Sequence, residues 1–209
     1  MTVDLDTLVL SQSRRGYDLI EAAAVYAGRD PEDHWVFPDV VTGFGRLLND
    51  LLHDRAQLVR YVPRIAGIAG RVGRSGWEQD QQRLQRMVDW VVRVNLPCRL
   101  AAAGFEAGRL EELPECTSEA ELDRHRDALA VAGYDVRCAL RGDWDSPTLP
   151  YASGAVLTAS IVLSVDYGST ASREEVASWA AEAVACALNY PADGCHVERA
   201  HELLERVFQ

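Results

Sequence analysis

Residues 38–63 read PDVVTGFGRLLNDLLHDRAQLVRYVP, and their apolar side chains recur every three or four positions. This spacing places them on one face of a helix. We expect the helix to begin at Pro38 and to end at Pro63, because proline suits a first helical turn and disrupts a helix interior. The apolar face consists of Val41, Phe44, Leu48, Leu51, Leu52, Leu58 and Val59.

The same helical spacing continues along most of the chain. Ser118-Glu-Ala-Glu121 and Ser172-Arg-Glu-Glu175 have the pattern of capping boxes, which open helices. Evidence for strands is thin: Ile161-Val-Leu-Ser-Val165 contains β-branched residues, but its alanine-rich context also suits a buried helix. The sequence therefore predicts an all-α fold, an irregular bundle of eight or nine helices in a single domain over 1–209, with a division near 64–76 as the alternative. The other expected helices cover about 4–27, 84–96, 97–103, 106–113, 118–140, 153–167, 172–190 and 197–207.

Composition excludes several classes of function. All 21 basic residues are arginine, so Schiff-base lysine chemistry and a Walker A phosphate loop are excluded. The formal net charge of −11 disfavours nucleic-acid binding. No apolar run is long enough to span a membrane, and no secretory signal precedes the first helix, so we expect a cytoplasmic protein. The five cysteines form no C-x-x-C pair, which predicts reduced, partly buried thiols.

One part of the chain resembles a known group of proteins. Residues 86–97 read RMVDWVVRVNLP, residues 100–105 read LAAAGF and residues 110–115 read LEELPE. This succession resembles the WLVR…P…L…AG…L..LPE pattern of uncharacterised actinobacterial proteins, over about residues 86–140. The second half of the chain departs from their low-complexity alanine repeats. The resemblance implies an actinobacterial origin and an all-helical fold, and it implies no activity.

The most distinctive segment runs from Arg55 to Gly76 and contains five arginines and no acidic residue. Glycine lets backbone N–H groups approach an anion, and the arginine guanidinium matches carboxylate or phosphate geometry. One interpretation is thus a contact for a small anion or an acidic partner. The alternatives are a helix face on which glycines allow close packing, or a connector. The candidate residues are Arg64, Gly67, Gly70, Arg71, Gly73 and Arg74.

Two other groups of residues are weaker candidates. Asp50 with His53, and Glu198 with His201, have the i, i+3 spacing that helical bundles use to bind metals, although helix surfaces carry such pairs by chance. The loop residues His34, Trp35 and Trp144 could line a small-molecule pocket. More often such aromatic residues pack between helices.

Taken together, these patterns favour a non-catalytic helical interaction or regulatory protein. Its arginine- and glycine-rich segment would contact a protein partner or a small anionic ligand, without a cofactor, and homo-oligomerisation stays open. The alternative is a small helical enzyme of specialised metabolism with a pocket of carboxylates, histidines and tryptophans, with or without a metal. The sequence does not choose between enzyme and non-enzyme.

Overall fold

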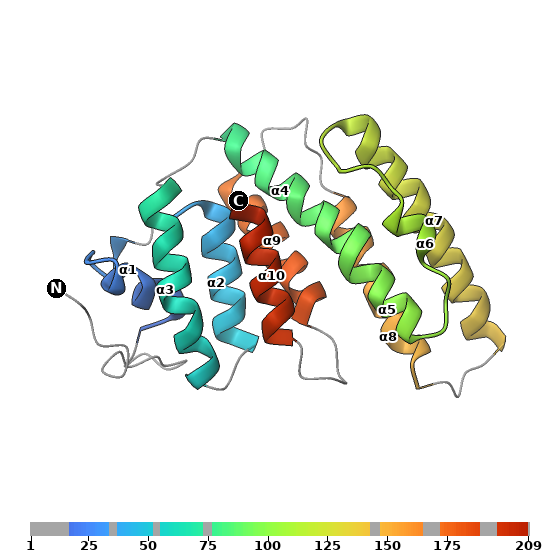
Figure 1. Ribbon diagram of the computed structural model, residues 1–209, viewed down its shortest axis with the longest axis horizontal. Coiled ribbons are helices and arrows are strands. Elements are labelled where there is room, and N and C mark those ends of the chain that lie inside the picture. The colour runs from blue at the N-terminus through green and yellow to red at the C-terminus, as the bar shows by residue number, and fades with distance from the viewer. Residues whose placement is uncertain are drawn as a thin grey trace. The chain divides into compact units, whose positions relative to one another are not determined.

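The computed structural model describes residues 17–33, 37–51, 55–72, 77–142, 147–164, 172–188 and 196–208. Throughout these residues the regular elements are helices, which confirms the all-α fold (Figure 1). In chain order they are α1 (Leu19–Tyr26), α2 (Asp39–Leu51), α3 (Arg55–Val72), α4 (Trp77–Trp90), the π-helical turn η2 (Val91–Asn95), α5 (Leu96–Ala102), α6 (Gly108–Glu111), α7 (Glu119–Gly142), α8 (Leu149–Leu163), α9 (Arg173–Leu188) and α10 (His196–Phe208).

The chain divides into two compact units. Unit 1 comprises residues 1–81 and 172–184, and unit 2 comprises residues 82–171 and 185–209. The divisions fall inside α4, just before α9 and inside α9, so the first of them lies beyond the 64–76 segment that the sequence offered as a boundary. Whether the two units act as one domain stays a prediction.

The first helix of unit 1 starts later than its apolar spacing predicts. Asp18 is extended, and its Oδ1 accepts hydrogen bonds of 2.8 Å from the N–H groups of Ile20 and Glu21. The Glu21 carboxylate in turn accepts the Asp18 N–H at 2.8 Å. This capping box fixes the start of α1 at Leu19, and residues 4–16 of the helix expected over about 4–27 lie outside the described residues. Gly28, with φ of +74°, ends the helix as expected.

Glycines on α2 let its neighbours approach closely within unit 1. A Cβ on Gly43 would lie 2.9 Å from the Ala177 Cα on α9, and a Cβ on Gly45 would lie 2.7 Å from Ile20 Cγ1 on α1. Larger residues would push these helices apart. The core around them contains Leu19, Ile20, Phe44, Leu48, Tyr61, Val62, Ile65, Val176 and Ala180.

The expected break at Pro63 is wrong, because α3 continues through this residue to Val72. Proline lacks an N–H and disfavours a helix interior, but Pro63 lies beside the buried face of this helix. Val62 and Ile65 are fully buried, and Tyr61 packs against Phe44 with ring centroids 6.4 Å apart. Packing of the apolar face thus overrides the local preference of proline. Residues 55–72 of the segment that runs from Arg55 to Gly76 are therefore helical.

Helix α4 ends at Trp90, before Pro97 as the sequence predicts, but the chain does not leave the helical path there. It passes into the π-helical turn η2, where the Leu96 N–H bonds to the Val91 carbonyl, and α5 follows directly. A π-turn widens the helix by one residue, so the proline that follows falls in the first turn of a new α-helix. Pro97 thus correctly indicates a discontinuity in the α-helix. This discontinuity is a π-turn and not an interruption of the helical path.

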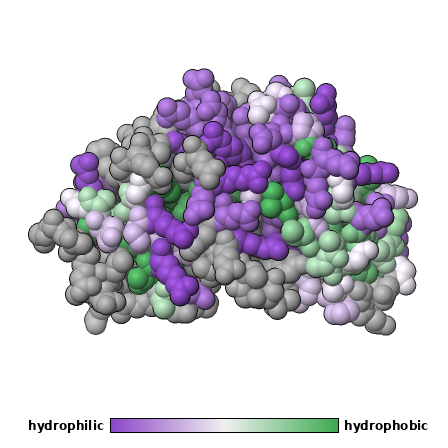
Figure 2. Space-filling model, viewed as in Figure 1, coloured by the Kyte–Doolittle hydropathy of each residue, from purple (hydrophilic) through white to green (hydrophobic). Residues whose placement is uncertain are grey.

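The starts of the two helices with expected capping boxes follow the sequence closely. Helix α7 begins after Ser118, whose Oγ bonds to Glu121, and α9 begins after Ser172, whose Oγ accepts the Glu175 N–H at 3.2 Å. Helix α8 begins four residues earlier than expected, with Pro150 in its first turn, and it includes the β-branched run up to Leu163. Figure 2 shows a largely hydrophilic face, with apolar residues reaching the surface around α5.

Candidate functional site

The exposed side of α3 carries Arg64, which the sequence singled out, together with Arg60. Ala56, Arg60, Arg64 and Gly67 are exposed, and they follow one another at helical intervals. The opposite side, with Leu58, Tyr61, Val62, Ile65 and Ile68, is buried. The burial of this apolar face orients α3 and leaves the arginines toward solvent.

Gly67 lies on the exposed side of α3. A Cβ at this position would meet nothing within 4 Å, so close helix packing does not explain the glycine. For Gly67, the structure therefore removes the close-packing alternative.

The charge of Arg64 acts on the buried side of the same helix. Burial raises the pKa of Tyr61 well above its usual value, and the nearby Arg64 guanidinium partly opposes this shift. Tyr61 thus stays a neutral phenol under the arginine face. Tyr61 packs against Phe44. The positive charge on this part of α3 comes from the arginines.

Other candidates on this segment are only partly described. Gly70 and Arg71 belong to α3, but their side-chain surroundings are not described, and Gly73 and Arg74 lie outside the described residues. The sequence had not selected Arg60 as a site residue. Its i, i+4 spacing to Arg64 is the signal that could have found it, once the segment is recognised as a helix.

The metal and pocket candidates also fall largely outside the described part. Asp50 is exposed on α2, His53 is outside the described residues, and the side chains of Glu198 and His201 on α10 are not described. His34, Trp35 and Trp144 lie outside it as well. Where side chains are described, no group of three or more His, Cys, Asp or Glu residues could hold a metal ion. The metal and pocket hypotheses stay predictions.

A second polar group, buried in unit 2, was not predicted from the sequence. Asp89 is 5 % exposed, and its Oδ1 accepts hydrogen bonds from Arg93 Nη1 at 2.9 Å and from the Cys116 N–H at 3.1 Å. Its Oδ2 lies 3.4 Å from Arg206 Nη2 on α10. The Asp89 carboxylate thus joins α4, the turn before α7 and α10. The i, i+4 spacing of Asp89 and Arg93 is the only sequence signal for this cluster.

Asn95, at the end of the π-turn, adds a further link to α10. It is 2 % exposed, and its Oδ1 accepts a hydrogen bond of 3.1 Å from Arg199 Nη1. π-turns often occur at functional sites. Here the turn and Asp89 place side-chain oxygens where two arginines of α10 meet them, so both anchor that helix within unit 2.

Cys116 and His125 lie beside Asp89. A cysteine, a histidine and an aspartate are residue types that also occur together in nucleophilic sites. Burial, with the negative charges of Asp89 and Glu121, raises the pKa of the Cys116 thiol to about 12. A catalytic cysteine needs a lowered pKa, because the thiolate is the nucleophile. Cys116 is therefore an inert buried thiol, whereas Cys98 and Cys138 are exposed, contrary to the expected partial burial.

His125 is a structural residue in the same cluster. It has no exposed surface, and its Nε2 lies 2.9 Å from the Pro114 carbonyl, which requires Nε2 to carry a proton and donate it. Its Nδ1 has no hydrogen-bond partner. Burial lowers the pKa of His125, although the Pro114 carbonyl and Asp89 oppose this shift. The hydrogen bond from the neutral ring to the Pro114 carbonyl thus links α7 to the segment before it.

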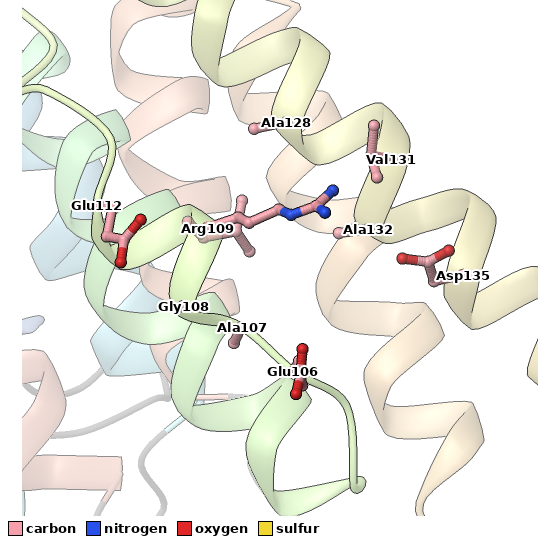
Figure 3. Close-up of a pocket in the computed structure, with 10 residues that line it drawn as sticks. Glu106, Ala107, Gly108, Arg109, Glu112, Ala128, Val131, Ala132 and Asp135 are labelled. Atoms are coloured by element: carbon pink, nitrogen blue, oxygen red, sulfur yellow. The ribbon is translucent and has the colours of Figure 1, made fainter.

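An open groove of about 770 Å³ lies between α6 and α7. Figure 3 shows Arg109 of α6 extending toward the side of α7 that carries Val131 and Ala132, with Asp135 on the same helix. Glu106 and Glu112 also line the groove. The groove combines acidic groups with one arginine, but it contains no nucleophile with a lowered pKa. The groove is therefore better suited to contact with another molecule than to catalysis.

No protein-family model matches the chain, and neither a curated protein nor a solved structure matches it. The function must be inferred from the residues themselves. Among the described helices, none is both long and apolar enough to cross a membrane.

Proposed function

We propose that this chain is a non-catalytic interaction or regulatory protein that uses the exposed arginines of α3 to contact an acidic protein surface or a small anion. The observation that carries the proposal is the exposure of Arg60, Arg64 and Gly67 on one side of a helix. The segment that contains them has no acidic residue, although the whole chain has a net charge of −11. Such a local positive face orients an acidic partner.

The chemistry of the arginine side chain fits this role. The guanidinium is always charged and offers paired donors to a carboxylate or a phosphate. The i, i+4 spacing lets Arg60 and Arg64 act on the same acidic group or on neighbouring ones. A carboxylate and a phosphate are therefore both compatible with binding to the exposed arginines of α3.

The buried groups of unit 2 favour this proposal over an enzyme. The Cys116 thiol has its pKa raised to about 12, and His125 and Asp89 are held by structural hydrogen bonds. These groups lack the access and the ionisation that nucleophilic catalysis needs. The enzyme alternative gains no support from their arrangement.

The test compares two double variants with the same change in charge. Arg60→Gln/Arg64→Gln alters the α3 face, and Arg124→Gln/Arg141→Gln removes two exposed arginines of α7. Binding of a fluorescent polyglutamate peptide and of pyrophosphate is measured by anisotropy and calorimetry. We expect the α3 variant to weaken binding about 10-fold or more, because two charge-assisted contacts are lost.

The control should change binding less than about twofold, since exposed charges elsewhere act only through screened fields. Loss of peptide binding alone would indicate an acidic protein partner, and loss of both would indicate a general anion site. Equal effects of the two double variants, or no binding of either probe by the unaltered protein, would contradict the proposal.

A further inference from the structure

The α7 wall of the groove between α6 and α7 is mainly apolar. Ala128, Val131, Ala132 and Asp135 all line the groove, and their i, i+3, i+4 and i+7 spacing places them on one side of α7. This side extends over about 10 Å of the helix. Val131, which lies within this set, is 47 % exposed. The α7 wall therefore offers an apolar surface to a side chain of another molecule.

The opposite wall is short, because α6 has only four residues. Leu110 of α6 is buried and holds this helix in unit 2, whereas Gly108 is exposed and lines the groove. A Cβ on Gly108 would meet nothing within 4 Å. The groove is therefore open beside Gly108, and an apolar side chain has room to lie between Gly108 and the α7 wall.

Carboxylates lie on both walls of the groove. Glu106 and Glu112 flank α6, and Asp135 lies on α7 (Figure 3). All three side chains belong to exposed residues. The sequence around them is also acidic, because residues 106–135 contain nine acidic residues and three arginines. A ligand that enters the groove thus meets a negative electrostatic field.

Among the described residues that line the groove, Arg109 is the only basic one. It extends toward Val131 and Ala132, so the aliphatic part of its side chain adds to the apolar surface (Figure 3). One guanidinium does not balance the three carboxylates of the lining. The charge of the groove is therefore negative, and it favours a cationic ligand.

We propose that this groove binds a basic segment of a partner protein, in which arginine or lysine residues flank an apolar side chain. The apolar side chain lies against Val131 beside Gly108, and the basic side chains meet the carboxylates of Glu112 and Asp135. Charge complementarity selects this partner, because the acidic lining and the net charge of −11 attract a basic segment and repel an acidic one. Unit 2 thus has a binding surface of opposite sign to the α3 arginines of unit 1.

The test measures binding of the fluorescent peptide Arg-Leu-Arg-Leu-Arg to the full chain by anisotropy, with Gln-Leu-Gln-Leu-Gln as the uncharged peptide. We expect Glu112→Gln/Asp135→Asn to weaken binding of the arginine peptide about 10-fold or more, because two charge-assisted contacts are lost. The matched control is Glu119→Gln/Glu202→Gln, which removes the same charge at exposed positions of α7 and α10 that do not line the groove. The control should change binding less than about twofold.

Two single variants separate the shape of the groove from its charge. Gly108→Leu fills the space beside α6 without changing the charge, and we expect about 10-fold weaker binding of the arginine peptide. The fold tolerates this change, because nothing meets the added Cβ, so the thermal unfolding temperature should not fall. Arg109→Gln should instead strengthen binding about threefold, because it removes a charge that repels the peptide.

Each variant also has a result that would overturn the proposal. If Arg109→Gln weakened binding, the groove would hold an acidic ligand. Equal effects of the two acidic double variants, normal binding by Gly108→Leu, or equal binding of the two peptides would exclude a specific basic contact. So would an unaltered protein that does not bind the arginine peptide.

The α3 double variant tests a second copy as the occupant. If α3 of another copy filled the groove, Arg60→Gln/Arg64→Gln would free it and strengthen peptide binding by more than about twofold. The proposal for a separate partner expects a change of less than about twofold, because α3 does not line the groove.

Discussion

The arginines of α3 and those around Asp89 differ in their surroundings. Arg60 and Arg64 lie on the exposed side of their helix. Arg93 and Arg206 meet the Asp89 carboxylate, whose side chain is only 7 % exposed. One residue type therefore has two roles, binding at a surface and anchoring helices inside unit 2. The comparison predicts that substitutions near Asp89 reduce stability, and that substitutions on α3 reduce binding with little effect on the fold.

The largest effect is expected from Asp89→Ala. The substitution leaves the buried Cys116 N–H without its acceptor and places two guanidinium groups near each other without a counter-charge. We expect a loss of about 3 kcal/mol in the free energy of unfolding. Urea denaturation followed by circular dichroism measures this loss.

A matched variant sharpens this measurement. Asp123 pairs with Arg126 at 2.8 Å, but its side chain is 64 % exposed. Asp123→Ala should cost less than about 0.5 kcal/mol, because exposed ion pairs contribute little. If the two aspartates cost the same, the idea that Asp89 anchors unit 2 is wrong.

A smaller effect is expected from the protonation of His125. Burial lowers its pKa, so the unfolded chain binds a proton at higher pH than the folded chain does. The contribution to stability is thus fully present above the unfolded pKa of about 6.5 and is lost as the pH falls toward the lower folded value. The charged groups around the ring are Asp89, Arg93 and Glu121.

His125→Gln tests this linkage, because its amide can still donate to the Pro114 carbonyl and does not titrate. We expect the unaltered protein to lose more stability than the variant between about pH 7.5 and pH 5.0, a range that includes the unfolded pKa of histidine. Urea denaturation at both pH values gives the difference. Parallel pH profiles of the two proteins would show that His125 does not contribute.

The smallest effect on stability is expected on α3. Arg60→Gln/Arg64→Gln should change the free energy of unfolding by less than about 0.5 kcal/mol, since both side chains are exposed. Arg93→Gln should cost about 1 kcal/mol or more, because Arg93 meets a buried carboxylate. A large loss of stability in the α3 variant would mean that these arginines anchor the helix, as the Asp89 group does in unit 2.

Sequence by itself determined the helical class, because the three-to-four spacing of apolar residues requires a buried helix face. It also determined those helix ends that depend on hydrogen bonds or backbone angles of a few neighbouring residues. Examples are the end at Gly28 and the caps at Ser118 and Ser172. The positive charge of the α3 segment is likewise a property of composition. These features depend on residues close together in the chain.

Tertiary structure decided where packing overrides local preference. Pro63 stays inside α3 because the apolar face of that helix, with Tyr61, Val62 and Ile65, is buried. The π-turn before Pro97 keeps the helical path continuous. Only the fold brings Arg206 to Asp89, across more than a hundred residues, and only the fold leaves Leu157 exposed while neighbouring apolar residues are covered. Such contacts join distant parts of the chain, so spacing along the sequence cannot specify them.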